Sequence, residues 1–318
     1  YNEGVNFSPR LGVAVNGIIG YDFFKDFVVE INYARKFLRV YDPERFNKQL
    51  NNYNEVVLRF FRNKPYVQSR IEIEGKELVT TLLIDNGMGD AVWLFNENSD
   101  IKVPARSFDD FLGLGLVGDV IGKRSRIKSL ELGGYRLNDV TAAFPDSISV
   151  EGLKMFDARD GSVGAEILRR FNMFFDYGAQ RLFLQKNKNF SDPFNYDMSG
   201  IIVEHSGFVI VETYMAVPDS DKGFDQGEVV VIPERQTQKS FELQPAFHIV
   251  SVRKDSPAYR AGLQVGDVLI SINGKEAYKY DLEEIVALFS SEEGKKIRLE
   301  VSRGSQNLKF DFKLEKVL

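Results

Sequence analysis

The chain has 318 residues, a net charge of −5 and no cysteine. The acidic balance and the lack of a clustered basic patch argue against a nucleic-acid-binding surface. The absence of cysteine excludes disulfides and cysteine-ligated metals. No apolar run reaches the ~20 residues of a membrane-spanning helix, so we expect no transmembrane segment. The length predicts two or three domains.

A motif near the start of the chain returns later in the sequence. At one constant offset, residues 17–20 (Gly-Ile-Ile-Gly) align with residues 161–164 (Gly-Ser-Val-Gly), Phe27 with Phe171, Tyr33 with Tyr177 and Leu38 with Leu182. Each copy predicts a turn, a short helix and a hairpin of two strands. Only the second copy has a long lead-in, residues 53–160. We therefore expect an internal repeat whose first unit lacks its front.

The lead-in is rich in predicted strands. An apolar run, residues 78–84, ends at Asp85-Asn86-Gly87. Glycine permits a tight turn there, and a carboxylate at the end of a buried strand is a candidate for acid–base chemistry. The alternative is a plain Asp-Asn-Gly turn between strands. Residues 112–122 follow and contain four glycines, which predicts a mobile hairpin.

The order of these elements resembles the retropepsin-like aspartic proteases. The family's catalytic loop falls on Asp85, Asn86 and Gly87. Its flap falls on Gly113, Leu114, Gly115 and Leu116, and its second motif falls on residues 162–164. The resemblance implies acid-protease β-barrel units in which two Asp residues, one per unit, share a proton and activate water. Asp85 would be one of them, and its partner would precede residue 1. The function it implies is an aspartic-type endopeptidase acting on peptides or unfolded proteins.

One position departs from that family. Asn86 stands where the family has Thr or Ser, whose hydroxyl holds the two catalytic loops together. An amide can donate and accept hydrogen bonds, but with another geometry. The alternative is a catalytically inactive peptide-binding or scaffold protein of the bacterial envelope.

The C-terminal third follows a different pattern. Residues 247–252 predict a strand, residues 256–263 a short helix with Pro early and Gly at its end, and residues 280–289 an amphipathic helix. The series Ser-Pro-Ala, Ala-Gly-Leu, Gly-Asp, Ile-Asn-Gly and Val-Ser-Arg-Gly closely resembles bacterial PDZ domains. Such domains bind an extended peptide as an added strand beside a helix. The resemblance places the peptide-binding residues at Ser199, Gly200, Ile201 and Ile202, following Met198, with loop amides holding the terminal carboxylate.

The predicted organisation is mainly β, with retropepsin-like β-barrel units followed by a PDZ domain. The predicted segments are residues 1–50 for the end of a first retropepsin-like unit, 51–190 for the second unit and 191–318 for the PDZ domain. Residues 217–243 read as an insertion that forms a mobile loop or lid. We expect a peptide or protein substrate and a PDZ peptide ligand as partners, and no metal or cofactor. The family resemblance also implies a periplasmic or surface-anchored location in a bacterium.

Overall fold

The computed structural model describes residues 7–96, 100–115, 118–146, 159–216 and 237–318. The chain is mainly β and divides into two compact units. The larger unit comprises Asn16–Tyr196 with Lys316–Leu318, and the smaller unit comprises Asp197–Glu315 with the N-terminal residues up to Val15. Among the described residues, no helix combines the length and the apolar character needed to cross a membrane.

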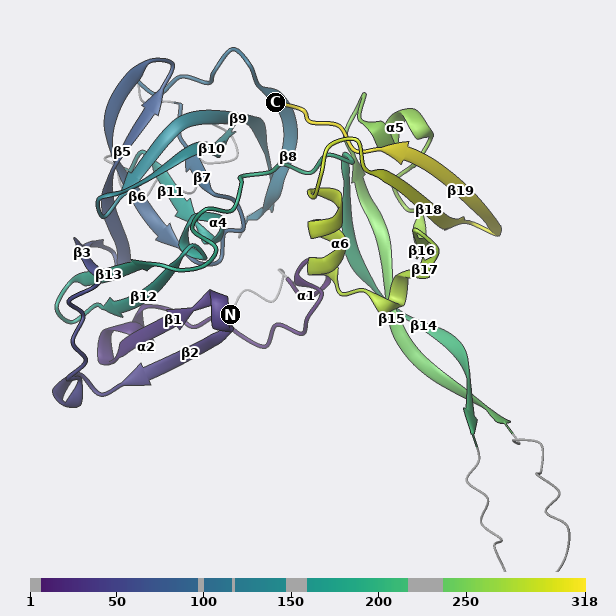
Figure 1. Cartoon of the computed structure of the whole chain (residues 1–318), viewed down its shortest axis with the longest axis horizontal. Helices are drawn as coiled ribbons and strands as arrows, with labels where there is room; N and C mark the ends of the chain where they lie inside the picture. Colours follow the sequence, from purple (N-terminus) through teal and green to yellow (C-terminus); the bar gives the residue numbers. More distant parts are fainter. Residues whose placement is uncertain (1–6, 97–99, 116–117, 147–158, 217–236) are drawn as a thin grey trace, which may run out of the picture. The chain divides into compact units, whose positions relative to one another are not determined.

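An eight-stranded sheet forms the body of the larger unit (Figure 1). Its strands are β4 (Arg59–Phe61), β5 (Lys64–Ile73), β6 (Lys76–Asp85), β7 (Val92–Leu94), β8 (Phe108–Gly115), β9 (Gly118–Leu132), β10 (Tyr135–Pro145) and β11 (Gly161–Gly164). Their spatial order is β4-β5-β6-β11-β7-β10-β9-β8, and a further pairing of β5 with β9 closes six of them into a ring. The short helix α4 (Ala165–Leu168) follows β11.

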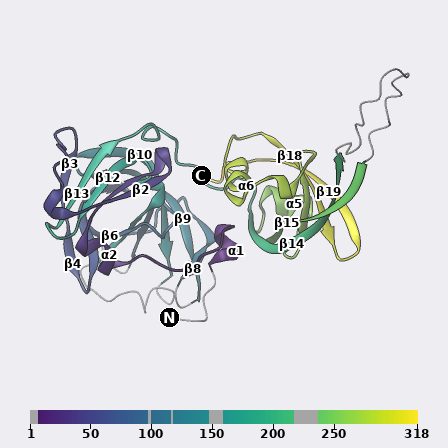
Figure 2. The ribbon, with the colours of Figure 1, turned by 90° about the horizontal axis from the view of Figure 1, so that it is seen from below.

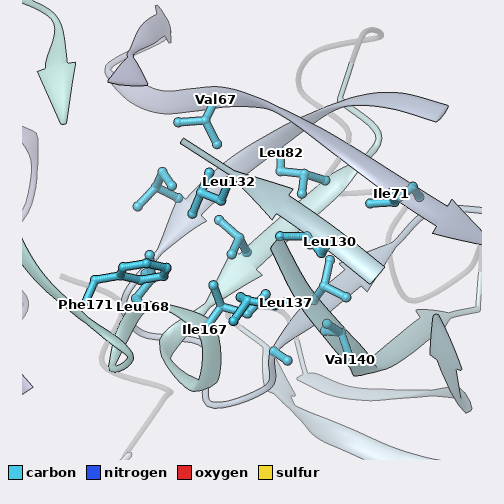
Figure 3. Close-up of a cluster of buried hydrophobic side chains, with 14 of the residues drawn as sticks. Val67, Ile71, Leu82, Leu130, Leu132, Leu137, Val140, Ile167, Leu168 and Phe171 are labelled. Carbon is cyan, nitrogen blue, oxygen red and sulfur yellow. The ribbon is translucent and has the colours of Figure 1, made fainter. Parts of the chain in front are cut away.

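The interior of this ring is apolar because the inward positions of its strands are aliphatic. Figure 3 shows Val67, Ile71, Leu82, Leu130 and Leu132 converging in this core. All five side chains are almost completely buried. Alternation of these residues with polar ones along β5 and β9 is the pattern of strands with one covered face.

The two copies of the sequence repeat meet in a second, five-stranded sheet. Its order is β2-β1-β12-β13-β3, with the strands β1 (Val28–Asn32), β2 (Phe37–Tyr41), β3 (Asn54–Val57), β12 (Phe171–Asp176) and β13 (Arg181–Lys186). β1 and β12 run antiparallel, and Glu30 lies opposite Phe174, the residue that the repeat aligns with it. The two hairpins are therefore related by a pseudo-twofold axis between these strands. Around them lie α2 (Tyr21–Asp26) and the 3-10 turns η1 (Tyr33–Arg35) and η2 (Pro43–Arg45).

The smaller unit consists of a single sheet and the helices α1, α5 and α6. The sheet order is β14-β15-β16-β18-β19, and β17 pairs with β16. The elements are α1 (Ser8–Leu11), β14 (Ile201–Ala216), β15 (Thr237–Val252), α5 (Pro257–Ala261), β16 (Val268–Ile272), β17 (Lys275–Glu276), η3 (Ala277–Lys279), α6 (Leu282–Phe289), β18 (Lys296–Arg303) and β19 (Gln306–Lys313). A capping box of Asp281 and Glu284 begins α6, and Ser256 caps α5.

Part of the segment 217–243, which we expected to be an insertion that forms a mobile loop or lid, is a strand. β14 and β15 form one long hairpin, and residues 237–243 belong to β15. The pairing continues as far as Ala216 opposite Thr237. Residues 217–236 lie outside the described part of the chain.

Arg124 connects two acidic residues inside the larger unit. Its Nη1 lies 2.7 Å from Asp90 Oδ1, and its Nε lies 2.7 Å from Asp110 Oδ2. Burial alone would lower the pKa of the guanidinium, but the two carboxylates outweigh burial and raise it. Trp93 Nε1 also donates to Asp90 Oδ2, at 2.6 Å. Four charged or polar groups thus satisfy one another in a mostly buried network.

We expect Arg124→Ala to lower the free energy of unfolding by about 3–5 kcal/mol, because it leaves two carboxylates without their cation. The neighbouring Lys123→Ala is the control, since the Lys123–Asp109 pair is exposed and such pairs contribute at most about 1 kcal/mol. Urea unfolding followed by the fluorescence of Trp93, the single tryptophan of the chain, measures both variants. Equal losses would contradict a structural role for the network.

Candidate functional site

The predicted catalytic loop lies at the end of β6. Gly87 N donates to Asp85 Oδ1 at 3.0 Å, and Met88 N donates to the Asp85 carbonyl at 3.3 Å, so the tripeptide forms a tight turn. Tyr33 Oη, from the first copy of the repeat, donates to Asn86 Oδ1 at 3.2 Å. β11 runs parallel to β6 and places Gly164 opposite Asp85.

A water-activating dyad needs a second carboxylate against the first. Among the described residues, none of the contacts that Asp85 makes is with another carboxylate. Its side chain accepts from its own turn, and the charge it interacts with is the guanidinium of Arg159. The arrangement at Asp85 therefore matches the Asp-Asn-Gly turn that the sequence left open as an alternative.

The expected flap residues lie on a hairpin. β8 and β9 pair from Phe108 opposite Arg124 to Gly115 opposite Gly118. Gly113 sits at a register shift in this hairpin, with φ of 154°. Leu114 and Gly115 end β8, and Leu116 lies outside the described residues.

A second candidate site is the outer edge of the sheet in the smaller unit. β14 is the last strand of its sheet, so the backbone on its outer side forms no ladder within the described residues. α6 packs against β14. We call the β14 residues Ile201–His205 together with α6 the recognition edge. Unpaired N–H and C=O groups of an edge strand are available to an added strand.

The turn that leads into the recognition edge is built around Gly200. Its φ is +84°, and a Cβ at this position would clash with the Cβ and Oγ of Ser256. Ser199 is fully buried, and its carbonyl accepts from Ala258 N at 3.1 Å. Arg253 N donates to the Gly200 carbonyl at 2.7 Å. These contacts fix the turn to the start of α5 and the end of β15.

Two amides of this turn are already occupied inside the chain. Gly200 N donates to Asp197 Oδ1 at 2.5 Å, and Ile201 N donates to Ser199 Oγ at 3.1 Å. Ser199 Oγ donates in turn to the Asp197 carboxylate, 2.9 Å from Oδ1. The turn therefore carries its own carboxylate. Asp197 was not among the predicted site residues, although an Asp two or three residues before a turn glycine commonly bonds the turn amides.

The N-terminal residues 7–15 also lie against the recognition edge. α1 contacts β14, and Arg10 Nη1 lies 3.4 Å from Glu204 Oε1. A Cβ built on Gly12 would lie 2.9 Å from the Cβ of Leu282, the first residue of α6. Nothing in the sequence pattern predicted this contact.

Among the described residues, no group of three or more His, Cys, Asp or Glu side chains is placed to hold a metal ion. His205 and His248 both lie on the β14–β15 hairpin, where Glu204 pairs with His248 and His205 with Phe247. The imidazole of His205 packs edge-on against Phe208 and Phe247, which places it in an aromatic cluster.

Comparison with known proteins identifies part of the smaller unit. The PDZ domain family matches residues 248–303. A probable CtpA-like serine protease of Staphylococcus haemolyticus is 32% identical over 102 residues, which cover 31% of this chain and 20% of that protein. The carboxy-terminal processing protease CtpA of Bacillus subtilis is 37% identical over 70 residues, which cover 22% of this chain and 15% of that protein. The similarity thus spans a fifth or less of these relatives.

Solved structures give only weak likeness. A structure described as the HtrA-type protease AlgW with decapeptide has a TM-score of 0.25 and 15% identity, and the match covers 88% of this chain and 67% of that one. This likeness carries no argument about the fold.

These findings confirm the predicted PDZ domain and correct the predicted catalytic class. The expected retropepsin-like aspartic endopeptidase is contradicted, because the relatives that match are serine proteases. The peptide-binding positions at Ser199, Gly200, Ile201 and Ile202 are not tested by the comparisons and stay a prediction.

We expect Gly200→Ala to destabilise the smaller unit far more than Gly266→Ala does. Both glycines have positive φ, +84° and +92°, but only Gly200 faces a clash, and nothing lies within 4 Å of the Cβ position at Gly266. Gly266→Ala should cost about 1–2 kcal/mol for its backbone conformation alone. Gly200→Ala should cost about 1–3 kcal/mol more for overpacking. Hydrogen exchange of the β16 amides measures both. Equal losses of stability in the two variants would show that the turn at Gly200 can accommodate a side chain.

Proposed function

We propose that the PDZ domain binds an extended segment of a peptide or protein along the recognition edge, and that the chain serves to recognise substrates for a serine-type peptidase. The observation that carries the proposal is the unpaired outer edge of β14 beside α6. An added strand forms main-chain hydrogen bonds with such an edge, and the adjacent helix contacts alternate side chains of the ligand. The relatives that share this sequence region are proteases, which need to hold extended chains.

The helix side of the proposed site is apolar. Leu282 faces the segment that covers β14, as its approach to Gly12 shows. Residues four apart on a helix lie on the same side, one turn along. Val286 therefore follows Leu282 on the side that faces the edge, and its side chain is 51% exposed. An exposed valine in this position can receive an apolar side chain of the ligand.

Serine-type peptidase activity in the chain itself is a second candidate, favoured by the names of the matching relatives. A serine–lysine contact does occur in the described part, between Ser291 Oγ and Lys295 Nζ at 3.3 Å. Both groups are exposed, whereas a lysine that activates a nucleophile is desolvated or next to another cation. That contact therefore does not supply a catalytic pair. Treatment of the chain with a fluorophosphonate followed by mass spectrometry tests the candidate, because it modifies an activated serine and spares ordinary hydroxyls.

The predicted location in the bacterial envelope remains part of this proposal. It rests on the pairing of a PDZ domain with similarity to bacterial proteases. Fractionation of the native host and detection of the chain with an antibody would test it.

We expect Val286→Asp to weaken peptide binding by about tenfold or more, because the ligand would bury an unpaired charge. Ala287→Asp is the matched control, since it adds the same charge to the neighbouring exposed position, about 100° around the helix. An array of immobilised decapeptides identifies ligands of the unmodified chain, and fluorescence anisotropy then gives the affinity of each variant. Absence of binding to any member of the array, or equal effects of the two substitutions, would refute the proposed site.

The occupied turn leads to a second expectation. Since Asp197 already accepts from Gly200 N, a ligand's terminal carboxylate would have to displace a like charge. We expect the same decapeptide with a free or an amidated C-terminus to bind within about twofold, less than 0.5 kcal/mol. Asp197→Ala should release the amide and favour the free carboxylate. A preference of tenfold for the free carboxylate in the unmodified chain would show that Asp197 gives way to the ligand.

A further inference from the structure

The N-terminal residues 7–15, which we call the N-terminal segment, belong to the same compact unit as the PDZ domain. They are separated from it in the sequence by the whole of the larger unit. α1 lies beside α6 and β14 in both views of the chain (Figures 1 and 2). The segment therefore covers the part of the molecule to which we assign peptide binding.

Its contacts reach both sides of the recognition edge. Arg10 pairs with Glu204 on β14. Gly12 lies so close to Leu282 on α6 that a Cβ would approach the Leu282 Cβ to 2.9 Å. The two contacts join the same short segment to the strand side and to the helix side. A ligand strand that extends as far as Glu204 and Leu282 would meet the segment there.

The segment holds its shape through its own hydrogen bonds. Gly12 N donates to the Ser8 carbonyl at 3.0 Å, and Val15 N donates to Ser8 Oγ at 2.9 Å. Gly12 has φ of +68°, which ends α1 in a left-handed turn. The segment is thus a compact turn and not a strand, and in the described chain β14 forms a ladder only with β15. The segment therefore adds no strand to the edge.

We propose that the N-terminal segment is an intramolecular competitor that occupies the recognition edge until a peptide displaces it. This inference rests on the proposed function, because it concerns the same edge. The ion pair of Arg10 with Glu204 is partly exposed, with side-chain exposures of 27% and 22%, and such pairs contribute little. A tethered segment acts at an effective concentration of about millimolar. Weak contacts are therefore sufficient to keep the edge covered while leaving it open to a better ligand.

Gly12→Val in the full chain tests the inference. Valine disfavours positive φ, and its Cβ would meet Leu282. The matched control is Gly17→Val, since nothing lies within 4 Å of the Cβ position of Gly17. The probe is a fluorescein-labelled synthetic peptide of residues 5–17, added in trans. We expect it to bind the Gly12→Val chain at least about tenfold more tightly than the unmodified chain or the Gly17→Val chain. Equal binding to all three chains, or to none, would overturn the inference.

A charge exchange provides a second measurement that does not depend on the valine. Arg10→Glu should speed hydrogen exchange at the amides of Gly12 and Val15, and the double variant Arg10→Glu with Glu204→Arg should slow it again. No change in either chain would show that the segment is not held by this edge.

The decapeptides from the array separate this inference from the proposed function. If they bind the Gly12→Val chain more tightly than the unmodified chain, competition is supported. If they bind all chains equally, the competitor is refuted and the binding site stands. If they bind neither chain, the proposed function fails, whatever the labelled segment does.

Discussion

The unpaired edge of β14 is the constraint on which the smaller unit depends. Backbone N–H and C=O groups are strong hydrogen-bonding groups, and an edge strand leaves a row of them without a ladder. Proteins protect such edges from aggregation by covering them. Here α6 and the N-terminal segment lie against the edge, and within the described residues no strand pairs with its outer side. Protection and recognition thus use the same surface.

The larger unit keeps the two copies of the repeat together in one sheet. Its two hairpins meet through β1 and β12, and Glu30 faces its repeat equivalent Phe174. Tyr33 of the first copy reaches Asn86 beside the predicted catalytic position. These contacts join the copies through strands and a neutral hydrogen bond. The guanidinium of Arg159 interacts electrostatically with the carboxylate of Asp85.

The features that the sequence predicted well are local ones. The Pro at the start of α5 and the glycine at its end depend on neighbours within a few positions, so they can be predicted from the sequence. The PDZ domain was predicted from the resemblance that a series of such short motifs carries. The first part of β15 was not predicted as a strand. Residues 237–243 are mostly polar and carry a weak strand pattern, but pairing with β14 makes them a strand.

The features that the sequence did not reveal are contacts between distant residues. Arg10 with Glu204, Gly12 with Leu282, and the partner of Asp85 each depend on how remote segments meet. A motif indicates which chemistry a residue can perform. Which groups lie next to that residue depends on the fold. For Asp85 the motif suggested an acid pair, and the relatives indicate a different catalytic class.

The chain's own groups occupy both the turn and the edge of the recognition site, and this determines how affinity arises there. The Asp197 carboxylate accepts from the turn amide, and the N-terminal segment lies against Glu204 of β14 and Leu282 of α6. A ligand therefore gains only the difference between its own contacts and those that it replaces. The backbone groups on the outer side of β14, beyond the Ile201 amide that Ser199 already bonds, are the exception, since no ladder within the described chain uses them. Strand addition is thus the one set of contacts that a ligand makes without displacing an equivalent set, and this favours extended peptides over compact ones.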